Sequence, residues 1–517
     1  MQFIQGKNRS QVSFYTQCLD ETIDSENEVR IIDLFVESIN ISDYKFTCKT
    51  TAEGRPAYNP KDLLKLFVYG YLNSIRSSRV LEKECKRNIE VMWLMKQLVP
   101  DHNTISNFRR DNEKAIRKVF RFTVSIAKQF DLIGGKLVAG DSTKLRAQNS
   151  KKNNFNPKKI ERHLAYIENK LDEYNQALEA ADASNIPNTS ENKAIIEQEI
   201  AKQNQRKDLY NDLTKQLAET GETQISLSDP ESRQMITRNN ITEVAYNVQT
   251  VVDAKHCLAI DYKVTNENDS KAMGEMLRRT KIILNSTDFT ALFDKGYHTG
   301  SEIKKGIELG INIMVAIPDV ASHAPDPAYD VEHFKYNEEL DYYSCPAQQI
   351  LNTNGKWYSK DNGKSTTQLK HYKTKACLTC PVFTKCTTNK KGRLITRSEH
   401  ADYIEQNRLN IAAKPKVYKQ RQAIVEHPYG IIKRQWGFYY ITTKKGIKRA
   451  SADAGLMFTA FNLRRIMNII DKKVFKKFLQ ELAFLFLEIL TLPKVFTSHI
   501  SNPFLANKKY TFIYQAA

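Results

Sequence analysis

Hydrophobic residues recur at helical spacing between residues 58 and 130. After Asn59-Pro60, a helix start, one face collects Leu63, Leu64, Phe67 and Tyr71. The segments SSRVLEKECKR and NIEVMWLM predict two further short helices. A longer helix follows PDHN, with Asn103 or Thr104 as its expected N-cap. This pattern predicts an all-helical domain over residues 1–130.

The early turns of the last of these helices are polar and basic, with Asn107, Arg109 and Arg110. Short helices followed by a helix of this kind are typical of a helix-turn-helix unit, in which such arginines contact DNA. The alternative is an ordinary helical bundle with solvated arginines, and periodicity alone favours that bundle.

From about residue 136 the pattern becomes strand-like. KLVAGDSTKLRA, EVAYNVQTVVD and HCLAIDYKVTN predict three strands, and the helical spacing of DSKAMGEMLRRTKIIL follows, with Asp269 as its expected cap. TALFD is a fourth strand, SEIKKGIELG a helix that ends at Gly310, and INIMVAIP a fifth strand. This order predicts an α/β catalytic domain over residues 131–470, an RNase H-like mixed sheet flanked by helices.

Two insertions interrupt the predicted sheet domain. Residues 157–220 are rich in Glu, Lys, Gln and Ala and predict a helical hairpin, with a solvated or partly disordered charged segment as the alternative. Residues 320–405 form a second insertion that contains clustered cysteines. Residues 471–517 predict a helical tail that packs on the core or mediates self-association.

Two aspartates fall at or near the ends of separate predicted strands, Asp141 and Asp294. Neighbouring carboxylates repel unless a cation lies between them, and hard oxygen ligands suit Mg²⁺ or Mn²⁺. Glu426, in QAIVEHPYGIIKRQWGF, is the best candidate for a third ligand. Lys433 follows seven residues later, so in a regular helix both would face the same way, and Lys433 could hold a phosphate there. Each residue alone is more often a turn, cap or surface residue.

The charge balance points to a polyanionic partner. The chain of 517 residues has 78 Lys plus Arg against 59 Asp plus Glu, a formal net charge of +19. Such a surplus favours nucleic acid, although a basic protein without that function is the alternative. The first residues do not resemble a signal peptide, and ELAFLFLEILTLP (481–493) is too short to span a bilayer, so we expect a cytoplasmic, nucleoid-associated protein without membrane contact.

Four of the eight cysteines cluster in the second insertion: Cys345, Cys377, Cys380 and Cys386. A Cys-x-x-Cys pair with two more cysteines can satisfy tetrahedral Zn²⁺, and a segment poor in aliphatic residues gains from such a staple. Only one pair has that spacing, so reduced free thiols and a redox role stay open beside a structural zinc.

Three motifs together resemble the DDE transposases of bacterial insertion sequences. VAGDSTKLRA is similar to the first-aspartate motif, ALFDKGYHTG to the second, and YKQRQAIVEHPYGIIKRQWG to the third, in which a Tyr, an Arg, the catalytic Glu and a Lys follow one another. The resemblance covers most of residues 50–470 and extends to PDHNTISNFRR and KGIKRASADAGLMFTAFNLRRI.

The resemblance implies a transposase acting on double-stranded DNA. Asp141, Asp294 and Glu426 would hold two Mg²⁺ or Mn²⁺ ions for cleavage at the element's ends and for strand transfer, and the chain would work as a homodimer or higher oligomer. The implied DNA contacts are Lys144, Arg146, Tyr418, Arg421, Lys433 and Trp436, although packing is the commoner role for Trp436. A metal-dependent nuclease without strand transfer and a catalytically idle DNA-binding relic are the alternatives.

The third motif departs from the family pattern. Four residues separate Arg421 from Glu426 where the family has three, a slip of about 100° around a helix, and Pro428 lies two residues after Glu426. We therefore expect Glu426 and Lys433, rather than Tyr418 and Arg421, to occupy their motif positions.

Overall fold

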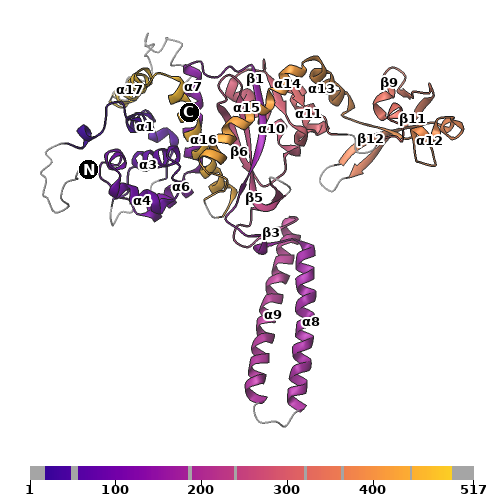
Figure 1. The fold of residues 1–517 in the computed structure, drawn as a ribbon, viewed down its shortest axis with the longest axis horizontal. Coiled ribbons are helices and arrows are strands. Elements are labelled where there is room, and N and C mark those ends of the chain that lie inside the picture. The colour runs from indigo at the N-terminus through magenta and orange to yellow at the C-terminus, as the bar shows by residue number, and fades with distance from the viewer. Residues whose placement is uncertain are drawn as a thin grey trace, which may run out of the picture.

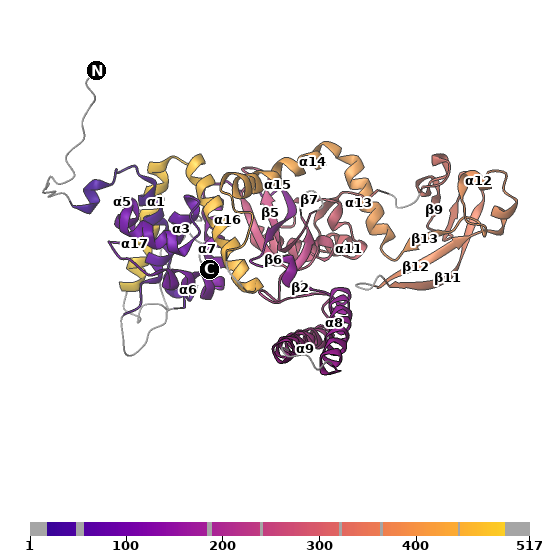
Figure 2. The ribbon, with the colours of Figure 1, turned by 60° about the horizontal axis from the view of Figure 1, so that its bottom comes forward.

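The computed structural model describes residues 18–47, 56–183, 189–237, 241–319, 323–361, 366–442 and 445–491, with side chains omitted at 181–192 and beyond 484. A helical region, a central mixed sheet and a smaller sheet follow one another along the longest axis (Figures 1 and 2). A long helical hairpin projects sideways from the central sheet. None of the described helices is both long and apolar enough to cross a membrane.

The N-terminal region is helical. Its helices are α1 (Glu28–Glu37), α2 (Ile41–Tyr44), α3 (Pro60–Leu72), α4 (Ser78–Arg87), α5 (Ile89–Leu94), α6 (His102–Asp111) and α7 (Glu113–Gln129). The cap expected for α6 is corrected: Asp101, rather than Asn103 or Thr104, accepts hydrogen bonds from the first-turn N–H groups of both residues. A carboxylate just before the helix satisfies donors that have no partner within it.

Two C-terminal helices bind this region to the sheet. In α16 (Ile447–Ile469), every residue from Ala450 to Leu463 is buried, because the helix lies between α3 and α7 on one side and β6 on the other. The following helix, α17 (Lys472–Thr491), contacts α1 and buries Phe475, Leu479 and Leu482. The described part of the tail therefore packs on the core.

The central sheet is mixed. Its strands are β1 (Leu137–Arg146), β4 (Arg233–Ile236), β5 (Thr242–Asp253), β6 (Ala259–Thr265), β7 (Thr290–Phe293) and β8 (Asn312–Val315). They lie in the order β4-β5-β1-β7-β8, and β6 also pairs with β5. The β1–β5–β6 pairings are antiparallel, whereas β7 and β8 run parallel to β1. The crossovers contain α10 (Met273–Leu284) and α11 (Gly300–Glu308), which confirms a mixed α/β core with a helical N-terminal region.

Two peripheral units carry small cores of their own. Short strands β2 (Asn154–Phe155) and β3 (Ile225–Ser226) flank α8 (Pro157–Ala183) and α9 (Thr189–Thr220), which pack together through Ile167 and Leu213. The second sheet has the order β13-β12-β11-β10-β9 and buries Phe334, Leu351, Tyr372 and Ile395. Its strands are β9 (Lys335–Asn337), β10 (Tyr342–Ser344), β11 (Ile350–Asp361), β12 (Thr366–Lys373) and β13 (Ile395–Ser398).

Candidate active site

Asp141 and Asp294 come from neighbouring parallel strands. Residue pairing between β1 and β7 runs from Leu137↔Thr290 to Ala139↔Leu292. Two further steps along this register place Asp141 opposite Asp294, which directly follows β7. The sheet therefore brings together two carboxylates that are 153 positions apart in the sequence.

A glycine allows the two strands to approach. A Cβ atom at Gly140 would lie 2.1 Å from Cε1 of the buried Phe293 ring, a distance that excludes any side chain. Gly140 and Phe293 immediately precede the two aspartates, so the close contact between them fixes how the carboxylates face each other.

The Asp141 carboxyl group is largely buried, with 23% of its side chain exposed. Its Oδ1 accepts the Ser142 N–H at 2.7 Å, and its Oδ2 lies 3.3 Å from Arg421 Nη1. Burial raises the pKa of Asp141 to about 6, and Asp294 and Asp269 add to this, while the Ser142 N–H and Arg421 oppose it. A carboxylate that is costly to ionise, beside a second one, is a place where a cation is favoured.

Helix α15 (Arg421–Tyr429) packs against β1 and β5. The Tyr429 hydroxyl donates to the Asp141 carbonyl oxygen at 3.1 Å. In the preceding short helix α14 (Pro415–Lys419), the Tyr418 hydroxyl donates to the Phe293 carbonyl oxygen at 3.0 Å. Together with the contact between Arg421 and Asp141, these hydrogen bonds hold α14 and α15 against Asp141 and against Phe293, the residue before Asp294.

The third motif does not divide as expected. Tyr418 contacts the end of β7 and Arg421 contacts Asp141 in β1, whereas Glu426 is exposed and accepts a hydrogen bond from Gln422 at 2.9 Å. Lys433 donates to Thr143 Oγ1 at 2.9 Å and to the Lys144 carbonyl oxygen at 3.3 Å. It lies in a π-helical segment, Gly430–Gln435, that follows Pro428. Because π-helical turns contain more residues, seven positions no longer return Lys433 to the face of Glu426.

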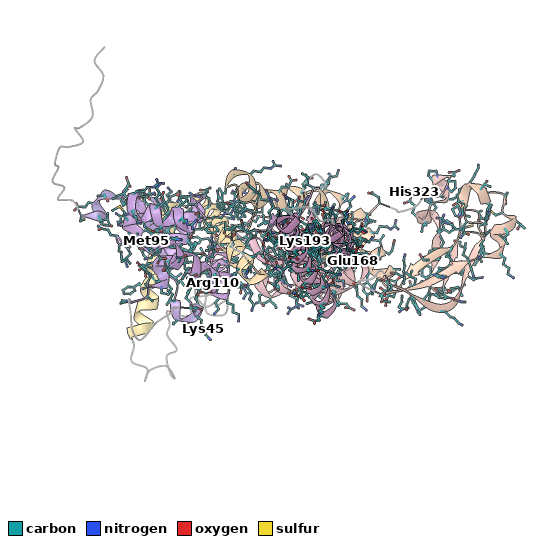
Figure 3. All side chains as sticks on the ribbon, turned by 90° about the horizontal axis from the view of Figure 1, so that it is seen from below. Lys45, Met95, Arg110, Glu168, Lys193 and His323 are labelled. Atoms are coloured by element: carbon teal, nitrogen blue, oxygen red, sulfur yellow. The ribbon has the colours of Figure 1, made fainter. Side chains whose placement is uncertain are left out.

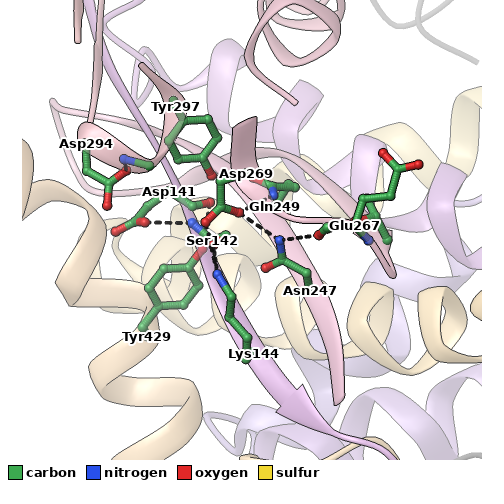
Figure 4. A network of polar contacts seen from close by, with 12 residues as sticks. Asp141, Ser142, Lys144, Asn247, Gln249, Glu267, Asp269, Asp294, Tyr297 and Tyr429 are labelled. Carbon is green, nitrogen blue, oxygen red and sulfur yellow. Dashed lines mark hydrogen bonds and ion pairs between the residues drawn. The ribbon is translucent and has the colours of Figure 1, made fainter. Parts of the chain in front are cut away.

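A third aspartate belongs to this site, although the sequence suggested only a helix cap. Asp269 Oδ1 accepts from Asn247 Nδ2 and Gln249 Nε2, both at 2.7 Å, and Oδ2 accepts from Lys144 Nζ at 3.0 Å (Figure 4). Burial would raise the pKa of Asp269, but Lys144 and Asn247 hold it below its ordinary value.

Asp269 also lies beside the second of the three sequence motifs, which begins at Asp294. A Cβ atom on Gly296 would lie 3.1 Å from Asp294 Oδ1 and 3.6 Å from Asp269 Oδ2. The buried Tyr297 hydroxyl donates to Gln249, which in turn holds Asp269. Alternation along β5 could have indicated that Asn247 and Gln249 are buried polar residues, but no local pattern links them to Asp269.

The remaining basic candidates differ in accessibility. Lys144 donates to Asp269 and Ser142, and Arg146 is half exposed beside Glu243. Arg110 reaches the surface of the helical region, paired with Asp111 (Figure 3). Trp436 is partly buried and packs against the main core.

The expectation of a DNA contact by Arg109 is wrong. Its side chain is 5% exposed, and its guanidinium donates to the Tyr71 hydroxyl at 2.9 Å and to the Arg76 carbonyl oxygen at 3.1 Å. Asp453 on α16 lies 3.6 Å away. The helical face that carries Arg109 is turned to the core, because α6 packs against α16.

The four clustered cysteines line one small cavity beside Phe334 and Leu351. Cys345 Sγ accepts the Gln349 N–H at 3.2 Å, and Cys386 lies in the short helix α12 (Phe383–Cys386). All four thiols are free. Among the described residues, no three or more His, Cys, Asp or Glu side chains are close enough together to hold a metal ion. This applies both to the cysteines and to the aspartates.

Comparison with known proteins gives two family matches. Residues 17–111 match a family described as Transposase domain (DUF772), and residues 344–467 match Transposase DDE domain. The second match includes Glu426 and Lys433 but neither Asp141 nor Asp294.

Similarity beyond these families is low. No curated protein sequence matches the chain. A solved structure, a piggyBac transposase synaptic complex with hairpin DNA, aligns over 91% of this chain and 83% of its own at 9% identity, with a TM-score of 0.31, which is too low to carry an argument. The two family matches, which cover the N-terminal helices and the third-motif region, support a DDE-type transposase of the insertion-sequence kind.

Proposed function

We propose that this transposase cuts DNA at the ends of its element and joins the freed 3′ ends to target DNA, with an RNase H-like core. The observation that carries the proposal is the placement of Asp141, within β1, opposite Asp294, which directly follows the parallel strand β7. The strand order β6-β5-β1-β7-β8 supports the fold assignment.

The donor set fits hard divalent cations. Asp141 and Asp294 supply adjacent carboxylate oxygens, and burial raises the pKa of Asp141, a cost of ionisation that a bound cation would offset. We propose Glu426 as the third ligand, because it lies one helical turn from Tyr429, which bonds to Asp141. Mg²⁺ or Mn²⁺ bound there would supply Lewis-acid activation of water and of the phosphodiester.

The chain's own residues would position the DNA. Lys144 lies on β1, and Lys433 contacts the same stretch of that strand from its π-helical segment, so both would present cations for backbone phosphates. Arg421 would hold the Asp141 carboxylate in place and offset its charge when DNA is absent. We further propose that two or more copies act together on paired ends.

The deciding experiment is cleavage and joining of a labelled DNA that carries the element's own ends, with Mg²⁺. We expect cleaved and joined products from the wild type and neither from Asp294→Ala. Cleavage without joining would favour the nuclease alternative, and binding without chemistry in either protein would favour a DNA-binding relic. Unchanged activity of the variant would remove Asp294 from the site.

Asp269 is expected to act by positioning Lys144. Asp269→Asn should lower cleavage about ten- to hundredfold, because a hydrogen bond between charged groups is worth about 1.5–3 kcal/mol. Combining it with Lys144→Ala should add little to either single change, since both remove the same contact. A purely structural role for Asp269 would instead give additive losses and a lower melting temperature.

We also propose that the four clustered cysteines bind one structural Zn²⁺. The shared cavity supports this, as does the N–H···S hydrogen bond to Cys345, which suits a thiolate. Chain purified from zinc-supplemented cells should contain about one zinc per chain. Cys380→Ser should abolish this content and loosen the second sheet. The control Cys18→Ser, at an exposed thiol outside the cluster, should keep the metal. Equal zinc in both variants would refute the site.

A further inference from the structure

The positive charge of the chain is concentrated in the second sheet. Between residues 342 and 398 there are nine lysines and two arginines against one acidic residue, Asp361. The helical hairpin at 157–220, by contrast, has nine basic and twelve acidic residues. Counted from the start of β9 to the end of β13 (335–398), the whole sheet has twelve basic residues against four acidic ones, so a net charge of +8 out of +19 lies in this one small unit.

Within that unit, β11 and β12 form a two-stranded ribbon. Their antiparallel pairing runs from Asn352↔Lys373 to Asp361↔Thr366, with a register shift between Thr353 and Trp357. Gly355, at φ +73°, lies within this bulge. Leu351 is buried in the small core, whereas every described residue from Asn354 to Asp361 is exposed. The ribbon thus projects from the core with both faces accessible.

One face of the ribbon combines cations with an aromatic ring. Lys356, Tyr358 and Lys360 alternate along β11, so they share a face. Tyr358 is 39% exposed and stacks on His371 of β12, with ring centroids 4.4 Å apart. These contacts hold a flat ring between two flexible lysines, outside any packed core.

The opposite face repeats this combination. Trp357 is 47% exposed, and Lys370, its partner across the ribbon, lies 5.1 Å from the ring centroid. A large exposed aromatic residue in a unit with few apolar side chains is not explained by packing. Exposed aromatic residues among lysines are typical of surfaces that contact nucleic acid.

We propose that the β11–β12 ribbon binds double-stranded DNA. A two-stranded β-ribbon fits the major groove, and lysines along it would neutralise backbone phosphates. The proposal rests on the proposed function only in that the chain acts on DNA. The ribbon and the N-terminal helices lie on opposite sides of the central sheet (Figures 1, 2 and 3). The ribbon would therefore hold DNA on the side of the central sheet that faces away from the N-terminal helices.

The test compares two charge-matched variants of the full chain. Lys356→Glu with Lys360→Glu replaces the two cations on the Tyr358 face of β11, and Lys158→Glu with Lys202→Glu makes the same change of net charge at exposed positions on the hairpin. Binding to a labelled duplex is measured across a salt series without divalent metal, so that no chemistry takes place.

The ribbon variant should bind the duplex about tenfold or more weakly, and the slope of log affinity against log salt should fall by about two, one for each lost phosphate contact. The hairpin variant should keep both the affinity and the slope of the wild type. Equal losses in the two variants, or stronger binding of single strands than of the duplex through the ribbon, would overturn the proposal. A chain that binds through the ribbon but neither cuts nor joins DNA would instead refute the proposed function alone.

Discussion

Asp141→Asn is expected to lower DNA cleavage by about 10³-fold. The substitution keeps the shape of the side chain but removes the negative charge beside Asp294, so the proposed site would lose its hold on a divalent cation. Metal activation contributes several kcal/mol to such reactions, and each 1.36 kcal/mol is a factor of ten in rate. The measurement is the initial cleavage rate on a labelled element end at saturating Mg²⁺.

Two further variants serve as a control and as a test of the third ligand. Asp288→Asn, at a carboxylate that is 84% exposed and paired with Lys136 at the surface, should leave the rate unchanged. Glu426→Gln should reproduce the loss if Glu426 completes the site. If Glu426→Gln keeps full activity while Asp141→Asn is inactive, Glu426 stays in its exposed position during catalysis and is not the third ligand.

Asp453→Ala is expected to lower the free energy of unfolding by about 3–5 kcal/mol, the usual cost of leaving buried charges without their partner. Asp453 on α16 is completely buried. Arg76 lies 3.5 Å and Arg109 3.6 Å from its carboxylate, which also accepts from Tyr71 and from the Thr442 N–H. Removing the carboxylate leaves Arg76 and Arg109, each no more than 5% exposed, without this negatively charged partner.

Chemical denaturation followed by circular dichroism measures this effect. Asp288→Ala removes a surface ion pair instead and should cost less than about 1 kcal/mol. A similarly small change for Asp453→Ala would mean that water or a rearranged neighbour replaces the carboxylate. The network joins helices α3 and α6 to α16, so a large effect would also show that the N-terminal region and the sheet unfold as one unit.

The sequence by itself determined the order of elements and singled out the two aspartates that the sheet brings together. Alternation and helical spacing are local properties, and they predict β1, β5, β6, β7 and β8 with their intervening helices in the observed order. Asp141 and Asp294 could be selected because each is a charged residue that directly follows a run of mostly hydrophobic residues within a predicted strand.

Only the tertiary structure decided which polar residues meet. Arg109 has the spacing of a surface arginine, yet α16, more than 300 residues later, covers it and supplies Asp453. Asp269 looks like a helix cap until β5 and β1 bring Asn247, Gln249 and Lys144 to its carboxylate. In the third motif, the π-helical turns after Pro428 change the phase of the helix, so that spacing no longer fixes the face of Lys433 relative to Glu426. Local patterns specify the elements, but the partners of a buried charge depend on contacts between segments far apart in the chain, which no local pattern records.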